Sequence, residues 1–105
     1  MFSFSILVKL EAKPGKEKEV EDFLRSALPF ALAEHGTTSW FAFKTGSRSF
    51  GIFDTFGTEA ARGAHLSGDM AKALMAKADE LFVEAPKIEL SETLAVKAPS
   101  NQAAE

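Results

Sequence analysis

The sequence predicts a single α+β domain whose elements follow the order strand–helix–strand–strand–helix–strand. Runs of alternating apolar or β-forming residues cover positions 2–11, 37–45, 48–56 and 87–97, and amphipathic helical segments separate them. The length of 105 residues and the hydrophobic fraction of 46% suit one domain with one core.

Residues 2–11 predict the first strand, because every second side chain is apolar. The intervening side chains are mostly polar, apart from Leu7. A period of two places the apolar set on one face of a sheet. We therefore expect this strand to bury one face and to carry Leu7 on the other.

A helical segment follows the turn at Pro14–Gly15. Apolar residues recur from Val20 to Ala31 at intervals of three and four, which gives one apolar stripe along a helix. Pro29 lies inside this stripe. A proline within a helix removes one hydrogen bond and clashes with the preceding turn, at a cost of roughly 3 kcal/mol. We expect the helix to kink here or to divide into two pieces.

Residues 37–45 and 48–56 predict a β-hairpin around Gly46–Ser47. Both strands have large apolar side chains on both faces. The face away from the helices takes either Phe41 and Phe43 or Trp40 and Ala42, together with either Phe53 or Ile52 and Phe56. The sequence leaves this choice open, because a shift of one residue exchanges the two faces.

The second helical segment begins after Thr58, which can cap a helix with its side-chain oxygen. Residues 60–66 predict a short helix, and Ser67–Asp69 interrupts it. A second apolar stripe then runs from Ala71 to Phe82.

The C-terminal part predicts one more strand and a tail. Residues 87–97 alternate well enough for a strand, although Glu92 breaks the pattern. Residues 98–105 are small and polar, which is typical of a flexible terminus. The folded domain is therefore expected to span residues 1–97.

The order of elements matches the split βαβ, or ferredoxin-like, motif with a four-stranded antiparallel sheet. Right-handed crossovers place both helical segments on one face of the sheet. The other face would then expose several aromatic side chains, which is more apolar surface than a monomer usually shows to water. A second copy, packed sheet against sheet, is the simplest cover, so we expect a homodimer.

Composition excludes several classes of function. The net charge of −3 offers no basic surface for nucleic acid or an anionic membrane. The absence of cysteine excludes disulfides and thiolate chemistry, and two histidines thirty residues apart make a weak case for a metal site. No apolar run is long enough to span a membrane and no signal peptide is evident, so we expect a cytoplasmic protein.

Three stretches of the sequence resemble one known family. They are the strand and Pro-Gly-Lys turn at Val8–Glu17, the helix end at Glu34–Thr37, and Phe53-Asp54-Thr55-Phe56 followed by Ala60-Ala61 and Ala64-His65-Leu66. Their order and spacing resemble the antibiotic biosynthesis monooxygenase (ABM) domains, which include the quinol monooxygenases of the dimeric α/β-barrel superfamily. The likeness covers roughly residues 4–97.

The resemblance implies a ferredoxin-like fold, a homodimer whose sheets face each other, and an apolar pocket between helices and sheet. The implied reaction is oxidation of a small aromatic or quinol-type molecule by O₂, with no cofactor. Because one fold hosts many functions, the likeness transfers the fold better than the reaction.

Five residues are candidates for the site that the resemblance implies. His65 could take a proton from a phenolic substrate, because its ordinary pKa lies near neutrality. Asp54 lies in an apolar run and needs a partner, which either Arg62 or His65 could supply. The Asp54 carboxylate could orient His65 for catalysis, or it could form an ion pair with a purely structural role. Trp40, Arg62 and Phe53 are candidate substrate-binding residues. Trp40 could stack a flat ligand, or belong instead to the core or a dimer interface.

Three functions fit these residues. The first is a cofactor-independent monooxygenase, and the second is a non-catalytic small-ligand-binding or stress-response dimer with the same pocket. Haem degradation, known in a sister branch of the fold, is less favoured. The proteins of that branch have an asparagine in the first strand, whereas the first strand here offers Ser3 and Ser5.

Overall fold

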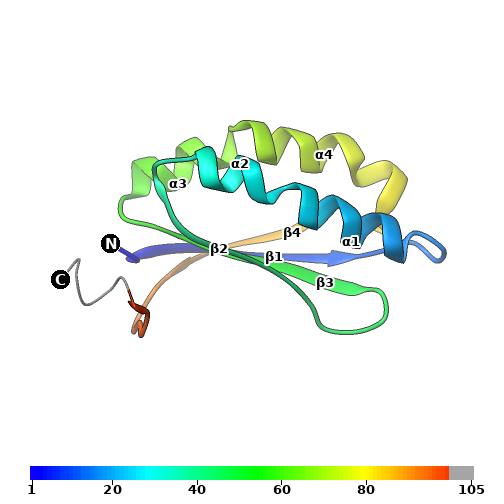
Figure 1. Ribbon diagram of the computed structural model, residues 1–105, viewed down its shortest axis with the longest axis horizontal. Coiled ribbons are helices and arrows are strands. Elements are labelled where there is room, and N and C mark those ends of the chain that lie inside the picture. The colour runs from blue at the N-terminus through cyan, green and yellow to red at the C-terminus, as the bar shows by residue number, and fades with distance from the viewer. Residues whose placement is uncertain (100–105) are drawn as a thin grey trace.

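A computed structural model describes residues 1–99, in which four antiparallel strands form one sheet and four helices cover one of its faces (Figure 1). The strands are Phe4–Glu11 (β1), Thr37–Lys44 (β2), Ser49–Phe56 (β3) and Lys87–Glu92 (β4). They lie in the order β2-β3-β1-β4. The predicted α+β, ferredoxin-like fold is therefore confirmed.

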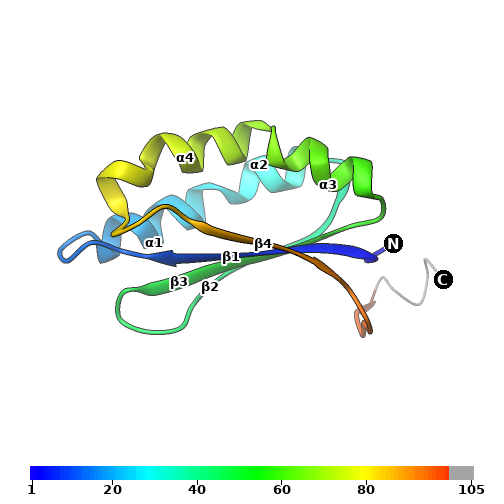
Figure 2. The same cartoon turned by 180° about the vertical axis from the view of Figure 1, so that it is seen from behind.

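The first helical segment divides at the position that its proline indicates. The helices are Glu17–Ser26 (α1), Leu28–Ala33 (α2), Glu59–Leu66 (α3) and Asp69–Leu81 (α4). Pro29 lies in the first turn of α2, where a missing N–H costs little. Seen from behind, all the labelled helices still lie on the same side of the sheet (Figure 2).

The strand register decides which hairpin residues lie under the helices. Asp54 of β3 lies opposite Ile6 of β1 and Trp40 of β2, and residues opposite each other point to the same face. Because Ile6 is buried in the core, this is the face that the helices cover. The alternation therefore places Trp40, Ala42, Ile52 and Phe56 under the helices, and Phe41, Phe43 and Phe53 on the opposite face.

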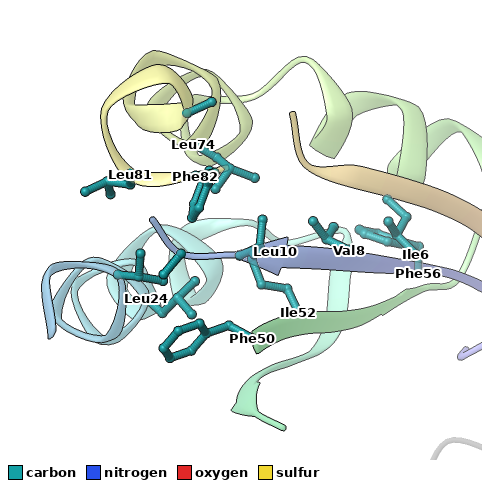
Figure 3. Close-up of a cluster of buried hydrophobic side chains, with 13 residues drawn as sticks. Ile6, Val8, Leu10, Leu24, Phe50, Ile52, Phe56, Leu74, Leu81 and Phe82 are labelled. Carbon is teal, nitrogen blue, oxygen red and sulfur yellow. The ribbon is translucent and has the colours of Figure 1, made fainter. Parts of the chain in front are cut away.

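The core fills the space between the sheet and the helices. Figure 3 shows Val8 and Leu10 of β1 and Phe50 of β3 facing side chains from the helices, such as Leu24 and Leu74. Phe56 at the end of β3 is fully buried. These apolar contacts fix the helices against the sheet and so position the side chains that lie between them.

The uncovered face of the sheet, here called the open face, carries the apolar cluster Leu7, Phe41, Phe43 and Phe53. Leu7 of β1 and Phe41 of β2 both lie opposite Phe53. Phe41 and Phe43, both from β2, are exposed. The Phe43 ring lies on Gly51, where a Cβ would overlap it. Among the described residues no helix covers this face (Figures 1 and 2).

The last strand is shorter than the sequence predicts. β4 ends at Glu92, which pairs with Phe4, the first residue of β1. Beyond it the Thr93 N–H donates one more hydrogen bond to the Ser3 carbonyl at 2.9 Å. Most of the predicted tail at 98–105 lies outside the described residues.

Within residues 1–99 no helix is long and apolar enough to cross a membrane. The longest of them, α4, has 13 residues, whereas a spanning helix needs about 20.

Candidate functional site

Three ionisable side chains from separate elements lie in a line. Asp54 is near the end of β3, His65 is in the last turn of α3, and Glu34 follows α2 directly. His65 Nδ1 lies 2.6 Å from Glu34 Oε1, and His65 Nε2 lies 3.0 Å from Asp54 Oδ2. The Thr37 hydroxyl donates a hydrogen bond to the same Glu34 oxygen at 2.7 Å. The imidazole therefore has a carboxylate at each ring nitrogen.

Burial decreases along this line from Asp54 to Glu34. The side chains of Asp54, His65 and Glu34 are 1%, 10% and 24% exposed, respectively. Asp54 Oδ2 is within ion-pair distance of His65, yet among residues 1–99 neither Asp54 oxygen has a partner with hydrogen-bond geometry. Asp54 is thus a buried carboxylate beside an imidazole, with oxygens that can still accept a hydrogen bond.

The two carboxylates determine the charge of His65. Burial alone acts to lower the pKa of His65, but the interactions with Asp54 and then Glu34 outweigh it and raise the pKa above its ordinary value of 6.5. The Phe56 ring packs against the imidazole with 5.2 Å between ring centres. The site therefore favours the imidazolium form of His65.

Two glycines allow the elements of the site to approach each other. A Cβ at Gly36 would lie 2.8 Å from the Ala61 Cβ, so the turn before β2 packs directly on α3. A Cβ at Gly68 would lie 3.3 Å from Glu34 Oε2. Gly68 is the N-cap of α4, so the positive end of that helix dipole faces the Glu34 carboxylate.

Asp54 and His65 both line a small cavity between the helices and the sheet. Its volume is about 40 Å³. The other lining residues are apolar: Ile6, Val8, Phe23, Leu24, Ala27, Ile52, Leu66, Met70, Ala71, Leu74 and Ile88. A charged pair at the wall of an otherwise apolar cavity can bind and deprotonate an aromatic hydroxyl group, because little water competes for the carboxylate.

A larger groove lies at the surface, on the Glu34 side of His65. It has a volume of about 420 Å³, and Glu34, His65, Thr37, Gly36 and Asp69 are among its lining residues. His65 is common to the cavity and the groove, whereas Asp54 lines the cavity and Glu34 lines the groove.

The structure brings only part of the predicted site together. Asp54 and His65 are adjacent, as the sequence allowed. Trp40 packs on the core beside Ala27 and Met70, and its buried Nε1 has no hydrogen-bond partner among the residues that the structure describes. Phe53 belongs to the open face, on the other side of the sheet from Asp54. Neither Trp40 nor Phe53 lines the small cavity, so substrate binding by them stays a prediction.

Arg62 is a largely buried side chain that joins the ends of two strands. Its Nη1 donates hydrogen bonds to the carbonyl oxygens of Ser91 at 2.9 Å and Ser5 at 3.3 Å. Its guanidinium carbon lies 5.2 Å from the centre of the Phe4 ring. Arg62 does not line the cavity, so the partner of Asp54 is His65, and a substrate contact by Arg62 stays a prediction.

Glu34 is the site residue that the sequence analysis did not single out. It belongs to Glu34-His35-Gly36-Thr37, one of the three stretches that resemble the ABM domains. An acidic residue two positions before a glycine at a helix end was the available signal. Its distance of 31 residues from His65 hid the contact. Within residues 1–99, no cluster of three or more histidine or acidic residues is arranged to hold a metal ion.

Comparisons with solved structures define the class of fold. A putative antibiotic biosynthesis monooxygenase from Nitrosomonas europaea is 14% identical with a TM-score of 0.79, over 88% of this chain and 99% of that chain. A putative antibiotic biosynthesis monooxygenase from Caulobacter crescentus is 18% identical with a TM-score of 0.76, over 90% of this chain and 92% of that chain. The chain therefore has the ferredoxin-like fold of the ABM structures.

A nearer relative shows the family. A protein of unknown function from Nitrosomonas europaea, NE2512, is 55% identical with a TM-score of 0.91, over 94% of this chain and 96% of that chain. The chain belongs to the same family as NE2512. No family model matches the sequence, and no curated protein matches it.

Proposed function

We propose that this chain is a cofactor-independent monooxygenase that oxidises a small aromatic or quinol-type substrate with O₂. The observation that carries the proposal is the buried Asp54 carboxylate, ion-paired to His65 at the wall of an apolar cavity. The names of the structural neighbours, putative antibiotic biosynthesis monooxygenases, support the same class of reaction.

Asp54 is the group that accepts the substrate proton in this proposal. Both ring nitrogens of His65 already face carboxylates, whereas both Asp54 oxygens lack a hydrogen-bond partner in the described part of the chain. A substrate hydroxyl in the cavity would donate to Asp54 and then lose its proton to it. The His65 imidazolium stabilises the charge that develops nearby.

The deprotonated, electron-rich ring then reacts with O₂. For an anthrone-type substrate, a ring CH₂ becomes a carbonyl: one oxygen atom forms the new C=O bond. The two hydrogens, one of them returned by Asp54, leave with the other oxygen as water. The substrate supplies four electrons and O₂ accepts them, so no further reductant is needed. The apolar walls exclude water from the anion.

The cavity must enlarge to admit such a substrate. A cavity of roughly 150 Å³ holds one benzene molecule in an engineered protein, whereas this cavity measures about 40 Å³. Leu66 at the end of α3 and Ile88 of β4 line the cavity and are also exposed to solvent. A substrate that entered past these two side chains would have to displace them.

A homodimer is part of this proposal. The open-face cluster of Leu7, Phe41, Phe43 and Phe53 is an apolar surface on the side of the sheet away from the site. Packing of two such faces would bury it. Sedimentation equilibrium at micromolar concentration tests this, and a monomer would contradict it.

Oxygen consumption with quinol and anthrone substrates tests the reaction. Isotopically labelled O₂ should place one labelled atom in the product. Asp54→Asn and His65→Gln should each lower the rate by on the order of 10²-fold or more. Asp22→Asn on α1, whose exposed side chain forms an ion pair with Lys18, serves as the control. A wild-type rate equal to the uncatalysed oxidation would contradict the proposal.

A non-catalytic ligand-binding dimer is the second candidate. Two observations favour it: the cavity is small, and each His65 ring nitrogen lies within ion-pair distance of a carboxylate. Such ion pairs also suit a histidine with a structural role. Calorimetry with a redox-inert aromatic ligand separates the two candidates. A binding protein should keep its affinity within a few fold in His65→Ala and should show no turnover.

A further inference from the structure

The two carboxylates beside His65 contact its ring in different ways. The contact between Nδ1 and Glu34 Oε1, at 2.6 Å, has hydrogen-bond geometry. The contact between Nε2 and Asp54 Oδ2, at 3.0 Å, is an ion-pair contact, and within residues 1–99 neither Asp54 oxygen has a hydrogen-bond partner. The outer carboxylate therefore holds the imidazole, whereas the inner carboxylate keeps its oxygens available to a ligand in the cavity.

The Glu34 carboxylate is itself held from two sides. The Thr37 hydroxyl donates a hydrogen bond at 2.7 Å to Oε1, the same oxygen that faces His65. On the other side, a Cβ at Gly68 would lie 3.3 Å from Oε2, so the start of α4 packs closely on this oxygen. These contacts fix the carboxylate in front of Nδ1.

Few other charged groups lie near the His65 ring. The ion pairs that the structure gives His65 are those with Glu34 and Asp54. The residues opposite Asp54 on the neighbouring strands, Ile6 and Trp40, are uncharged. The other titratable or charged side chains on the surrounding elements are His35 before β2, Asp69 of α4 and Arg62 of α3. Removal of Glu34 would therefore take away one of the two negative charges in direct contact with the imidazole.

We propose that Glu34 is a positioning residue of the cavity site, which holds the charged His65 ring from the groove side and so leaves Asp54 free to accept the substrate hydroxyl. The proposal rests on the proposed function. Glu34 lines the groove and does not line the cavity, so it acts on the substrate through His65. Without Glu34, the imidazolium would turn fully to Asp54 and would compete with the substrate for the Asp54 oxygens.

The pH dependence of kcat tests the effect of the Glu34 charge. Glu34→Gln keeps an oxygen that can accept a hydrogen bond from Nδ1–H but loses the negative charge, so the pKa of His65 should fall. With the quinol substrate, kcat should match the wild type at about pH 5.5 and should be lower by on the order of tenfold above about pH 8. A purely structural role would cost the same factor at every pH. Glu80→Gln, on an exposed carboxylate of α4 that pairs with Lys77, is the control.

Binding of a redox-inert phenol tests the orientation of the ring and needs no turnover. Calorimetry at about pH 5.5 compares the variants while the imidazole is protonated. Glu34→Ala leaves Nδ1–H without its acceptor, so the ring turns to Asp54 and the phenol should bind about tenfold more weakly. Glu34→Gln still holds the ring and should keep the affinity within about twofold. NMR spectra of the same samples identify a variant that has not folded.

The outcomes separate the two proposals. A loss of kcat in Glu34→Gln that is the same at every pH, or equal phenol affinities in Glu34→Ala and Glu34→Gln, would overturn the role of Glu34 and leave the monooxygenase proposal intact. Absence of turnover in the wild type would overturn the proposed function. In that case the phenol decides: weaker binding in Glu34→Ala alone supports the positioning role, and equal affinities, or no binding to the wild type, overturn it.

Discussion

Gly36→Ala tests the close packing that brings Glu34 to His65. The new Cβ would lie 2.8 Å from the Ala61 Cβ, about 1 Å short of the usual carbon–carbon contact distance. The turn before β2 and α3 must therefore separate, which costs about 1–3 kcal/mol as overpacking does elsewhere. The lower entropy of the unfolded chain returns about 0.4–1 kcal/mol. We expect a net loss of about 1–2 kcal/mol in the free energy of unfolding.

Ala61→Gly provides the matching half of a double-mutant cycle. It costs about 1 kcal/mol by itself, because glycine is a poor helix former. In the double variant the clashing methyl is gone, so the combined loss should be smaller than the sum of the single losses by about 1 kcal/mol. Gly63→Ala is the control within α3: nothing lies within 4 Å of its new Cβ, and it should stabilise the protein by about 0.5–1 kcal/mol.

Urea unfolding followed by circular dichroism measures all four variants. Additive losses in the cycle would refute the argument, because they would mean that Gly36 and Ala61 do not contact each other. NMR titration of His65 gives a second readout. Since the turn carries Glu34 away from the imidazole, the pKa of His65 should fall in Gly36→Ala and recover in the double variant.

Three further predictions concern the site and the sheet. The folded-state pKa of His65 is raised above 6.5, so the stability that protonated His65 contributes is complete below pH 6.5 and is lost as pH rises through the folded pKa. Urea unfolding across this pH range should show that loss in the wild type and not in His65→Gln. Arg62→Met should cost about 1–3 kcal/mol and speed amide exchange in β4, since the Ser91 carbonyl loses a charged donor. Gly51→Val should displace the Phe43 ring and weaken any dimer, measured by sedimentation, with the Asp54–His65 contact unchanged in NMR.

Local patterns were enough to predict the elements, because their causes are local. The alternation of apolar and polar residues predicted β1, and Pro29 predicted the division between α1 and α2. The end of β4 has a different cause: Glu92 pairs with Phe4, where β1 begins, so later residues have no partner in that strand. Strand length is thus set by the neighbouring strand, which a single alternating pattern does not reveal.

The candidate site was predictable only in part for the same reason. Asp54 and His65 are eleven residues apart, and one strand–turn–helix unit brings them together. Glu34 reaches His65 from 31 residues away, through packing of the Gly36 turn on α3. Such a contact depends on which faces of two elements meet, and the helical and strand periods of either segment alone do not contain that information.

Alternation along β3 explains how one strand can serve two purposes. Phe53 and Asp54 are neighbours in sequence, yet they point to opposite faces of the sheet. A polar residue in place of Phe53 would therefore alter the open face and leave the cavity wall unchanged, whereas Asp54→Asn would do the reverse. Association and site chemistry can accordingly be changed separately by substitutions one position apart. A slip of β3 by one residue would exchange the two faces and expose the carboxylate, so the same register that buries the core also places Asp54 against His65.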